Sequence, residues 1–208
     1  PDISFAVSQV AQFNHKPKKS HGSAVKTLLR CLKGTKDKGM TVKLKDGLVF
    51  DLYCDADFAG LYKKDPDTSP TSAKSRMGYI ITLAGLPVVW KSQLLQEITL
   101  SSLESEYSCA SIALRTLLPL NCITQELADG LGLSPDLQAT IRSNVHEDNN
   151  SAKQLMTEQH LTNHTCYILV KWHWFWWMVK GSKKLLEVLC DDTKDQLADN
   201  FTKQSDAE

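Results

Sequence analysis

The sequence has no apolar run that approaches the roughly 20 residues needed to cross a bilayer as a helix, so no membrane-spanning segment is predicted. It opens PDISFAVSQV, with neither an initiator Met nor a basic leader region, so we expect no secretion signal and a chain cut from a longer polyprotein. The six cysteines are scattered without a CxxC motif, which favours a reduced, intracellular compartment. His160, His164 and Cys166 offer part of a zinc site, but a fourth ligand at suitable spacing is lacking.

Negatively charged residues are nearly absent from the first 45 residues. They carry ten Lys or Arg against Asp2 and Asp37, a formal charge of +8, so the rest of this neutral chain carries −8. A basic arm joined to an acidic body suggests a polyanion held beside a cluster of acids. A solvated, Lys-rich linker is the alternative, and charge alone does not decide between them. At 208 residues and 42% hydrophobic content, the chain has room for one full domain plus a fragment of another.

Hydrophobic periodicity predicts a mixed α/β domain after two short helices. Three successive strands form an antiparallel meander, and a long amphipathic helix follows from the Ser101-Ser102-Leu103-Glu104 capping box. Pro119 is expected to kink or split that helix. The order β-β-β-α-β-α-α-β-α predicts a mixed five-stranded sheet with helices on it. The predicted helices cover 3–13, 23–33, 101–129, 151–158, 165–179 and 196–203, and the predicted strands cover 41–45, 49–54, 77–83, 88–91, 139–146 and 185–190.

The stretch DLYCDADFAG (51–60) ends an apolar, alternating run in two acids, Asp55 and Asp57. The pattern predicts a half-buried strand, and acids at its end either aim at a metal ion or begin a turn. Other acids also stand where elements begin or end: Glu104 and Glu106 in the long helix, Asp148 after the fourth strand and Asp199 after the fifth. If the first and fourth strands are parallel neighbours, their carboxyl ends share one edge of the sheet. Carboxylates gathered there repel one another unless hard divalent cations such as Mg²⁺ or Mn²⁺ lie between them.

These motifs resemble the ribonuclease H domain of copia-type LTR retrotransposon polyproteins. The matching stretches are CDADFAG (54–60), SAKSRMGYIITLAGLPVVWKSQ (72–93), LSSLESEYSCAS (100–111), EDNNSAKQL (147–155), KWHWF (171–175) and DTKDQLADNFTK (192–203). Residues 1–45 resemble the helical end of the preceding reverse transcriptase. The resemblance implies a ribonuclease H-like α/β domain over 46–203, preceded by that small helical segment and followed by a tail over 204–208.

The resemblance further implies a metal-dependent endonuclease that hydrolyses the RNA strand of RNA·DNA hybrids during reverse transcription. Two Mg²⁺ ions, for which Mn²⁺ can substitute, are its expected cofactors. The expected partners are the hybrid and the polymerase domain of the same polyprotein, with no membrane, in a cytoplasmic virus-like particle or the nucleus. Glu106 matches the family's helix acid better than Glu104, and Asp57 ranks below Asp55. The implied catalytic and metal-ligating residues are Asp55, Glu106, Asp148 and Asp199.

The first, helical part of the chain carries the basic residues expected to bind the phosphate backbone of a hybrid, namely Lys18, Lys19, Lys26, Arg30 and Lys33. The aromatic run 172–177 favours packing of a helix on the sheet over stacking on bases, with one or two Trp exposed.

The chain also departs from the family. Residues 163–167 lack the family's basic run, and no His follows the fifth strand. His173 is expected to be a helix-face or core residue. A catalytically inactive or co-opted nucleic-acid-binding or interaction module is therefore the alternative function. An integrase or resolvase relative is disfavoured by the acid spacing after the fourth strand.

Overall fold

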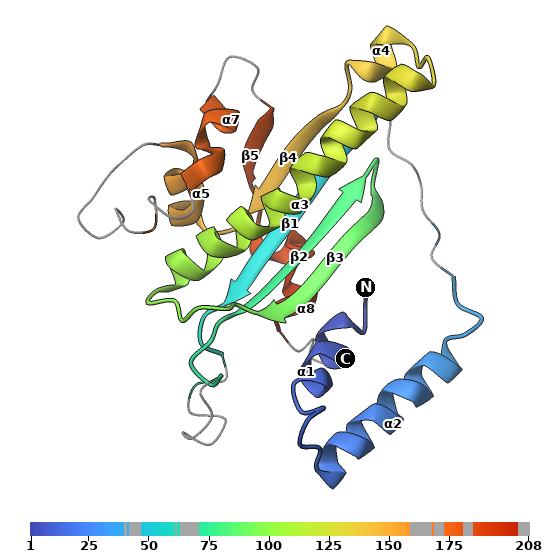
Figure 1. Ribbon diagram of the computed structural model, residues 1–208, viewed down its shortest axis with the longest axis vertical. Coiled ribbons are helices and arrows are strands. Elements are labelled where there is room, and N and C mark those ends of the chain that lie inside the picture. Colours follow the sequence, from blue (N-terminus) through green and yellow to red (C-terminus); the bar gives the residue numbers. More distant parts are fainter. Residues whose placement is uncertain are drawn as a thin grey trace.

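The computed structural model describes residues 1–39, 41, 47–60, 62, 71–158, 168, 173–180 and 185–203. A five-stranded mixed sheet in the order β3-β2-β1-β4-β5 forms its centre (Figure 1). β1 pairs antiparallel with β2 and parallel with β4, so the predicted meander and βα units are confirmed. The strands are β1 (Val49–Asp57), β2 (Arg76–Leu83), β3 (Leu86–Leu94), β4 (Arg142–Glu147) and β5 (Leu186–Cys190).

Helices lie on both faces of this sheet, and two precede it (Figure 1). They are α1 (Ser4–Ala11), α2 (Lys19–Gly34), α3 (Ser102–Gly130), α4 (Pro135–Gln138), α5 (Asn150–Thr157), α7 (Trp176–Lys180) and α8 (Asp199–Thr202), with 3-10 turns η1 (His173–Phe175) and η2 (Thr193–Asp195). Among the described residues, no helix has the length and apolar content that a membrane span requires.

The central strand β1 is buried on both faces rather than half-buried. Its even-numbered residues face α3, whose side chains complete the main core. Its odd-numbered residues Asp51, Tyr53 and Asp55 face the other side, where α8 packs on β1 and β2. Because side chains alternate along a strand, this second face collects the polar groups of the predicted pattern. The core residues are Phe50, Leu52, Cys54, Ala56, Met77, Tyr79, Ile81, Tyr107, Ala110, Ala113, Leu114, Leu117 and Val145.

The long helix α3 begins where the capping box predicts. Ser101 Oγ accepts a hydrogen bond from the Glu104 backbone N–H at 3.1 Å, and Glu104 Oε2 accepts one from the Leu100 N–H at 2.7 Å. The expected split at Pro119 is wrong, because α3 is one continuous element through that residue. Pro119 lies on an exposed position, where solvent can satisfy the carbonyl that the proline leaves without a donor.

The ends of the chain differ most from the prediction. α1 packs against β3 and α8, whereas every residue of α2 is at least partly exposed and the helix projects from the sheet (Figure 1). The predicted helix over 196–203 is wrong in extent, because Gln196 is extended and the helix begins at Asp199.

Several predictions fall partly or wholly on residues outside the described ranges. These are the strand at 41–45, the partial zinc site, the altered segment at 163–167 and the boundary between residues 45 and 46. The aromatic run is partly described. Phe175 is buried, Trp174 Nε1 donates to Ser111 Oγ at 2.8 Å, and Trp177 is 58% exposed. For these residues, the expected mixture of core packing and exposure is confirmed.

Gly78 lets α8 lie close to the sheet, and this contact is testable. A Cβ added at Gly78 would lie 2.5 Å from Phe201 Cβ and 2.9 Å from Thr202 Cγ2. We expect Gly78→Ala to lower the free energy of unfolding by about 1–3 kcal/mol, measured by urea denaturation. Gly22→Ala, at an open helical position, is the control and should raise stability by up to about 1 kcal/mol. Undiminished stability of Gly78→Ala would contradict the close packing.

Candidate active site

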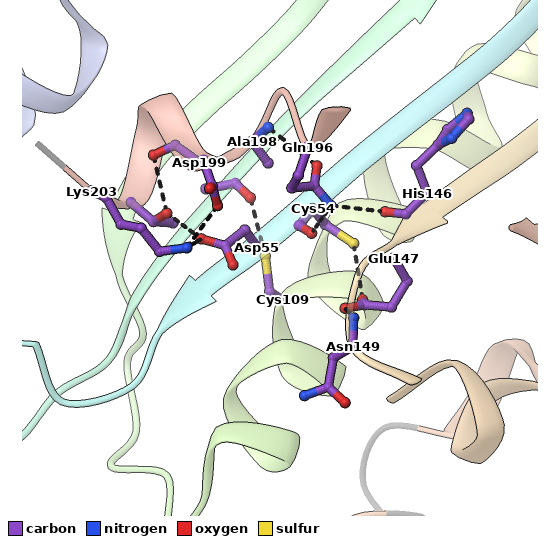
Figure 2. Close-up of polar contacts among 12 residues, drawn as sticks. Cys54, Asp55, Cys109, His146, Glu147, Asn149, Gln196, Ala198, Asp199 and Lys203 are labelled. Carbon is purple, nitrogen blue, oxygen red and sulfur yellow. Dashed lines mark hydrogen bonds and ion pairs between the residues drawn. The ribbon is translucent and has the colours of Figure 1, made fainter. Parts of the chain in front are cut away.

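Asp55 lies at the end of the central strand and is only 4% exposed. Thr202 Oγ1 donates a hydrogen bond to Asp55 Oδ2. Lys203 Nζ lies 3.7 Å from the same oxygen (Figure 2). Burial raises the pKa of Asp55 to about 6, against the effects of Thr202 and Lys203; the nearby charges of Asp199 and Asp148 raise it further. Asp55 is therefore a buried acid whose ionised form is poorly compensated.

Asp199 reaches the same place from α8. Lys203 Nζ lies 2.8 Å from Asp199 Oδ1, so one ammonium group bridges Asp199 and Asp55 (Figure 2). Burial alone would lower the pKa of Lys203. The hydrogen bond to Asp199 and the charges of Asp55 and Asp199 have the larger effect, so the pKa of Lys203 is raised overall. The structure thus brings together two of the four acids implied by the resemblance.

Glu106 approaches from α3, on the other side of the strand end. Its Oε2 atom is buried and has no hydrogen-bond partner among the described residues. Burial raises the pKa of Glu106 to about 7; Asp55 adds to the rise, and a hydrogen bond from Asn149 opposes it. An orphaned carboxylate oxygen in such a place is a group that lacks a cation or a donor.

Asp148 follows β4 directly and is partly exposed. Its charge contributes to the raised pKa values of Asp55 and Glu106, so it lies near both. All four predicted acids therefore gather at the carboxyl ends of β1 and β4. The sequence argument from two parallel strands sharing an edge anticipated this convergence.

Glu147 is a fifth carboxyl group that the sequence analysis missed. It is fully buried, accepts a hydrogen bond from the Asn149 N–H at 3.3 Å, and lies 3.8 Å from Cys54 Sγ. Burial, followed by the charge of Glu106, raises its pKa well above the ordinary value. The signal for it was strand alternation: Val145 faces the core, so Glu147, two residues on, faces the core as well.

The two acids that the sequence ranked second have contacts of their own. Glu104 caps the start of α3, as described above. The Asp57 carboxylate lies against Gly60 in the following turn and close to the buried guanidinium of Arg76. Burial lowers the pKa of Arg76, and the charge of Asp57 opposes this effect in part.

The basic residues predicted to bind nucleic acid do not join this cluster. Lys18, Lys19, Lys26, Arg30 and Lys33 are all exposed, in or directly before α2. Figure 1 shows α2 apart from the end of β1. Any role in binding would therefore be played at a distance from the acids.

The donor chemistry fits a hard divalent cation, because every converging ligand is a carboxylate oxygen. The orphaned Glu106 oxygen and the raised pKa values of Asp55 and Glu106 are both conditions that a bound cation would relieve. Within the described part of the chain, however, no group of three or more His, Cys, Asp or Glu residues is arranged to hold a metal ion. Among the described residues, the Lys203 ammonium is the cationic group that lies between two of the acids, Asp55 and Asp199.

Comparisons with known proteins bear on the family and the fold of this chain. The retrovirus-related Pol polyprotein from transposon RE2 of Arabidopsis thaliana is 31% identical over 203 residues, which is 98% of this chain and 13% of that protein. The corresponding polyprotein from transposon TNT 1-94 of Nicotiana tabacum is 34% identical over 203 residues, covering 98% of this chain and 14% of that protein. The chain thus spans about one seventh of the length of these curated relatives. No model of a protein family matches it.

Among solved structures, LC11-RNase H1, isolated from compost by a metagenomic approach, superposes with a TM-score of 0.50 at 16% identity. The match covers 76% of this chain and 93% of that one. At this identity the likeness concerns the fold.

The raised pKa of Asp55 predicts an unusual pH dependence of stability. A carboxyl group whose pKa rises on folding, here from 3.8 to about 6, contributes stability that is full below pH ~4 and is lost as the pH rises through about 6. In EDTA, we expect Asp55→Asn to be more stable than the parent at pH 8 by about 3 kcal/mol and nearly equal at pH 4, since the pKa differs by about two units and each unit corresponds to about 1.4 kcal/mol. Urea denaturation at both pH values measures this. The control Asp129→Asn, at an exposed position, should show no such change; a pH-independent offset for Asp55→Asn would refute the account.

Proposed function

The chain belongs to the retrovirus-related Pol polyproteins of transposons and has the fold of a ribonuclease H domain, and on this premise we propose that it is a metal-dependent endonuclease that cleaves the RNA strand of RNA·DNA hybrids during reverse transcription. One observation carries the proposal. Asp55 on β1, Glu106 on α3, Asp148 directly after β4 and Asp199 on α8 converge at one edge of the sheet. A purely structural fold gains nothing from burying like charges together.

Each acid has a role that follows from its place. Asp55, the most buried of the four, would be the central ligand of the bound cations, and Glu106, Asp148 and Asp199 would supply the other carboxylates. Two Mg²⁺ ions held by these carboxylates, with Mn²⁺ as a substitute, would activate water and stabilise the leaving 3′-oxygen, giving 3′-OH and 5′-phosphate ends. Thr202 fixes the Asp55 carboxylate through its hydroxyl group, and Lys203 holds Asp199 beside it.

The proposed partner is an RNA·DNA hybrid, read by its shape and its 2′-hydroxyl groups rather than by its sequence. Lys18, Lys19, Lys26, Arg30 and Lys33 are proposed to contact its phosphates, which agrees with their exposure on the projecting helix α2. We further propose that residues 1–45 are the end of a copia-type reverse transcriptase whose polymerase domain works beside this one. The proposed compartment is a cytoplasmic virus-like particle or the nucleus.

A second candidate, an inactive or co-opted nucleic-acid-binding or interaction module, is favoured by one observation. The Lys203 ammonium lies between Asp55 and Asp199 and offsets part of the charge that metal ions would otherwise neutralise. Binding of nucleic acid and cleavage of it must therefore be measured separately.

Incubation of a labelled RNA·DNA hybrid with Mg²⁺ tests the proposal. We expect the parent to cut the RNA strand and Asp55→Asn to be at least ~1,000-fold slower, because the central carboxylate of the site is lost. Asp129→Asn, a matched change at the exposed end of α3, should retain full activity. Equal cleavage by the parent and Asp55→Asn would reject the assignment of the site. A parent that binds the hybrid without cutting it would establish the second candidate instead.

A further inference from the structure

The parallel strands β1 and β4 separate at the site. Their last paired residues are Tyr53 and His146, and the carboxylates of Asp55 and Asp148 each lie two residues farther on. The carbonyl groups of His146, in that last pair, and of Cys54, one residue past it on β1, therefore stand where the pairing of the two strands stops. Buried carbonyl groups require a hydrogen-bond donor.

The side chain of Gln196 supplies that donor. Its Nε2 atom donates to the Cys54 carbonyl at 3.1 Å and to the His146 carbonyl at 3.3 Å, so one amide group ties the two strand ends together (Figure 2). Its Oε1 atom accepts a hydrogen bond from the Ala198 N–H at 3.2 Å. Gln196 itself is 4% exposed.

These three bonds join the elements that carry three of the four acids. Cys54 directly precedes Asp55 on β1, His146 lies two residues before Asp148, and Ala198 directly precedes Asp199. The donors and acceptors also fix the orientation of the amide, because two carbonyl oxygens require the NH₂ group and one backbone N–H requires the oxygen. A carboxylate or a hydrocarbon side chain could not make all three bonds.

We infer that Gln196 is a positioning residue that sets the spacing of Asp55, Asp148 and Asp199 by clamping the ends of β1 and β4 to the start of α8. The inference rests on the proposed function of the site and adds a residue to it. Its amide group bonds three backbone groups, so the proposed role acts through the backbone that carries the acids. The clamp also explains why the terminal helix is shorter than predicted, since a helical Gln196 could not extend its side chain between the strands.

Gln196→Met tests the clamp, because methionine has nearly the same length and volume but cannot make the bonds. Gln138→Met is the matched control, since Gln138 Nε2 donates one hydrogen bond to the Leu133 carbonyl beside α4. For Gln196→Met we expect kcat to fall about 100-fold with KM for the hybrid within twofold, because a misplacement of about 1 Å has that effect on a catalytic group. Mn²⁺ affinity, measured by calorimetry without substrate, should fall about 10-fold. Gln138→Met should change neither quantity.

Amide hydrogen exchange separates the clamp from the proposed activity. In Gln196→Met, the amides of Ala198 to Lys203 should exchange at least ~10-fold faster, while those in the middle of β1 and β2 stay unchanged. The inference is wrong if these amides exchange in Gln196→Met at the same rate as in the parent. It is also wrong if the parent cleaves the hybrid and binds Mn²⁺, and Gln196→Met has the same kcat and the same Mn²⁺ affinity. If the parent neither cleaves hybrid nor binds Mn²⁺, the proposed function fails and the metal-positioning role falls with it; exchange then decides only whether Gln196 holds α8.

Discussion

The burial of like charges at the end of the central strand is the constraint on which the rest of this structure depends. Asp55 has almost no contact with solvent, yet the charges of Asp199 and Asp148 raise its pKa, and Asp55 in turn raises the pKa of Glu106. An arrangement of this kind weakens a folded protein unless positive charge is supplied. Here one lysine supplies part of that charge, and one oxygen of Glu106 still has no partner among the described residues.

Much of the remaining fold serves to bring these groups together. Gly78 pairs with Asp55 in the register of β1 and β2. Because Gly78 has no side chain, Phe201 and Thr202 can lie close to the sheet at this point. The close approach of α8 places Thr202 on Asp55 and carries Asp199 and Lys203 to the same edge. α3 packs its apolar face on the other side of the sheet and presents Glu106 beyond the strand end. Gln196 then joins the strands at the point where they separate.

The sequence predicted the topology from simple periodicities, and it pointed to the four acids through their places at the ends of elements together with the family resemblance. Alternation along 49–54 and the acids after it implied a strand with a functional end, and the parallel pairing of β1 with β4 brought Asp148 to the same edge. Glu147 was missed because two adjacent acids after a strand look alike until it is known which one faces the core. Burial of both faces of β1 was missed because Asp51 and Asp55 look like solvent-facing residues, whereas α8 and a polar network cover them.

That polar network was also beyond the reach of local patterns. His146 of β4 lies between Asp51 at 3.1 Å and Asp191 at 2.8 Å and stacks on Tyr53; Asp51 and Tyr53 belong to β1, and Asp191 follows β5. The same limitation explains the error at Gln196. Its neighbours favour a helix, but two long-range hydrogen bonds and a local one to Ala198 hold it extended, and tertiary contacts of this kind override propensity. Continuity of α3 through Pro119 is a further case, since only the exposure of that turn makes the lost hydrogen bond tolerable.

The central claim is that these carboxylates form a site for divalent cations, with Lys203 holding part of the positive charge when none is bound. A crystal structure of the protein grown with Mn²⁺, using anomalous scattering to locate the metal, tests this claim most directly. The account predicts manganese between Asp55, Glu106, Asp148 and Asp199, with the Lys203 ammonium displaced from Asp55. An unchanged ion pair between Lys203 and Asp55, with no anomalous signal at the end of β1, would contradict it.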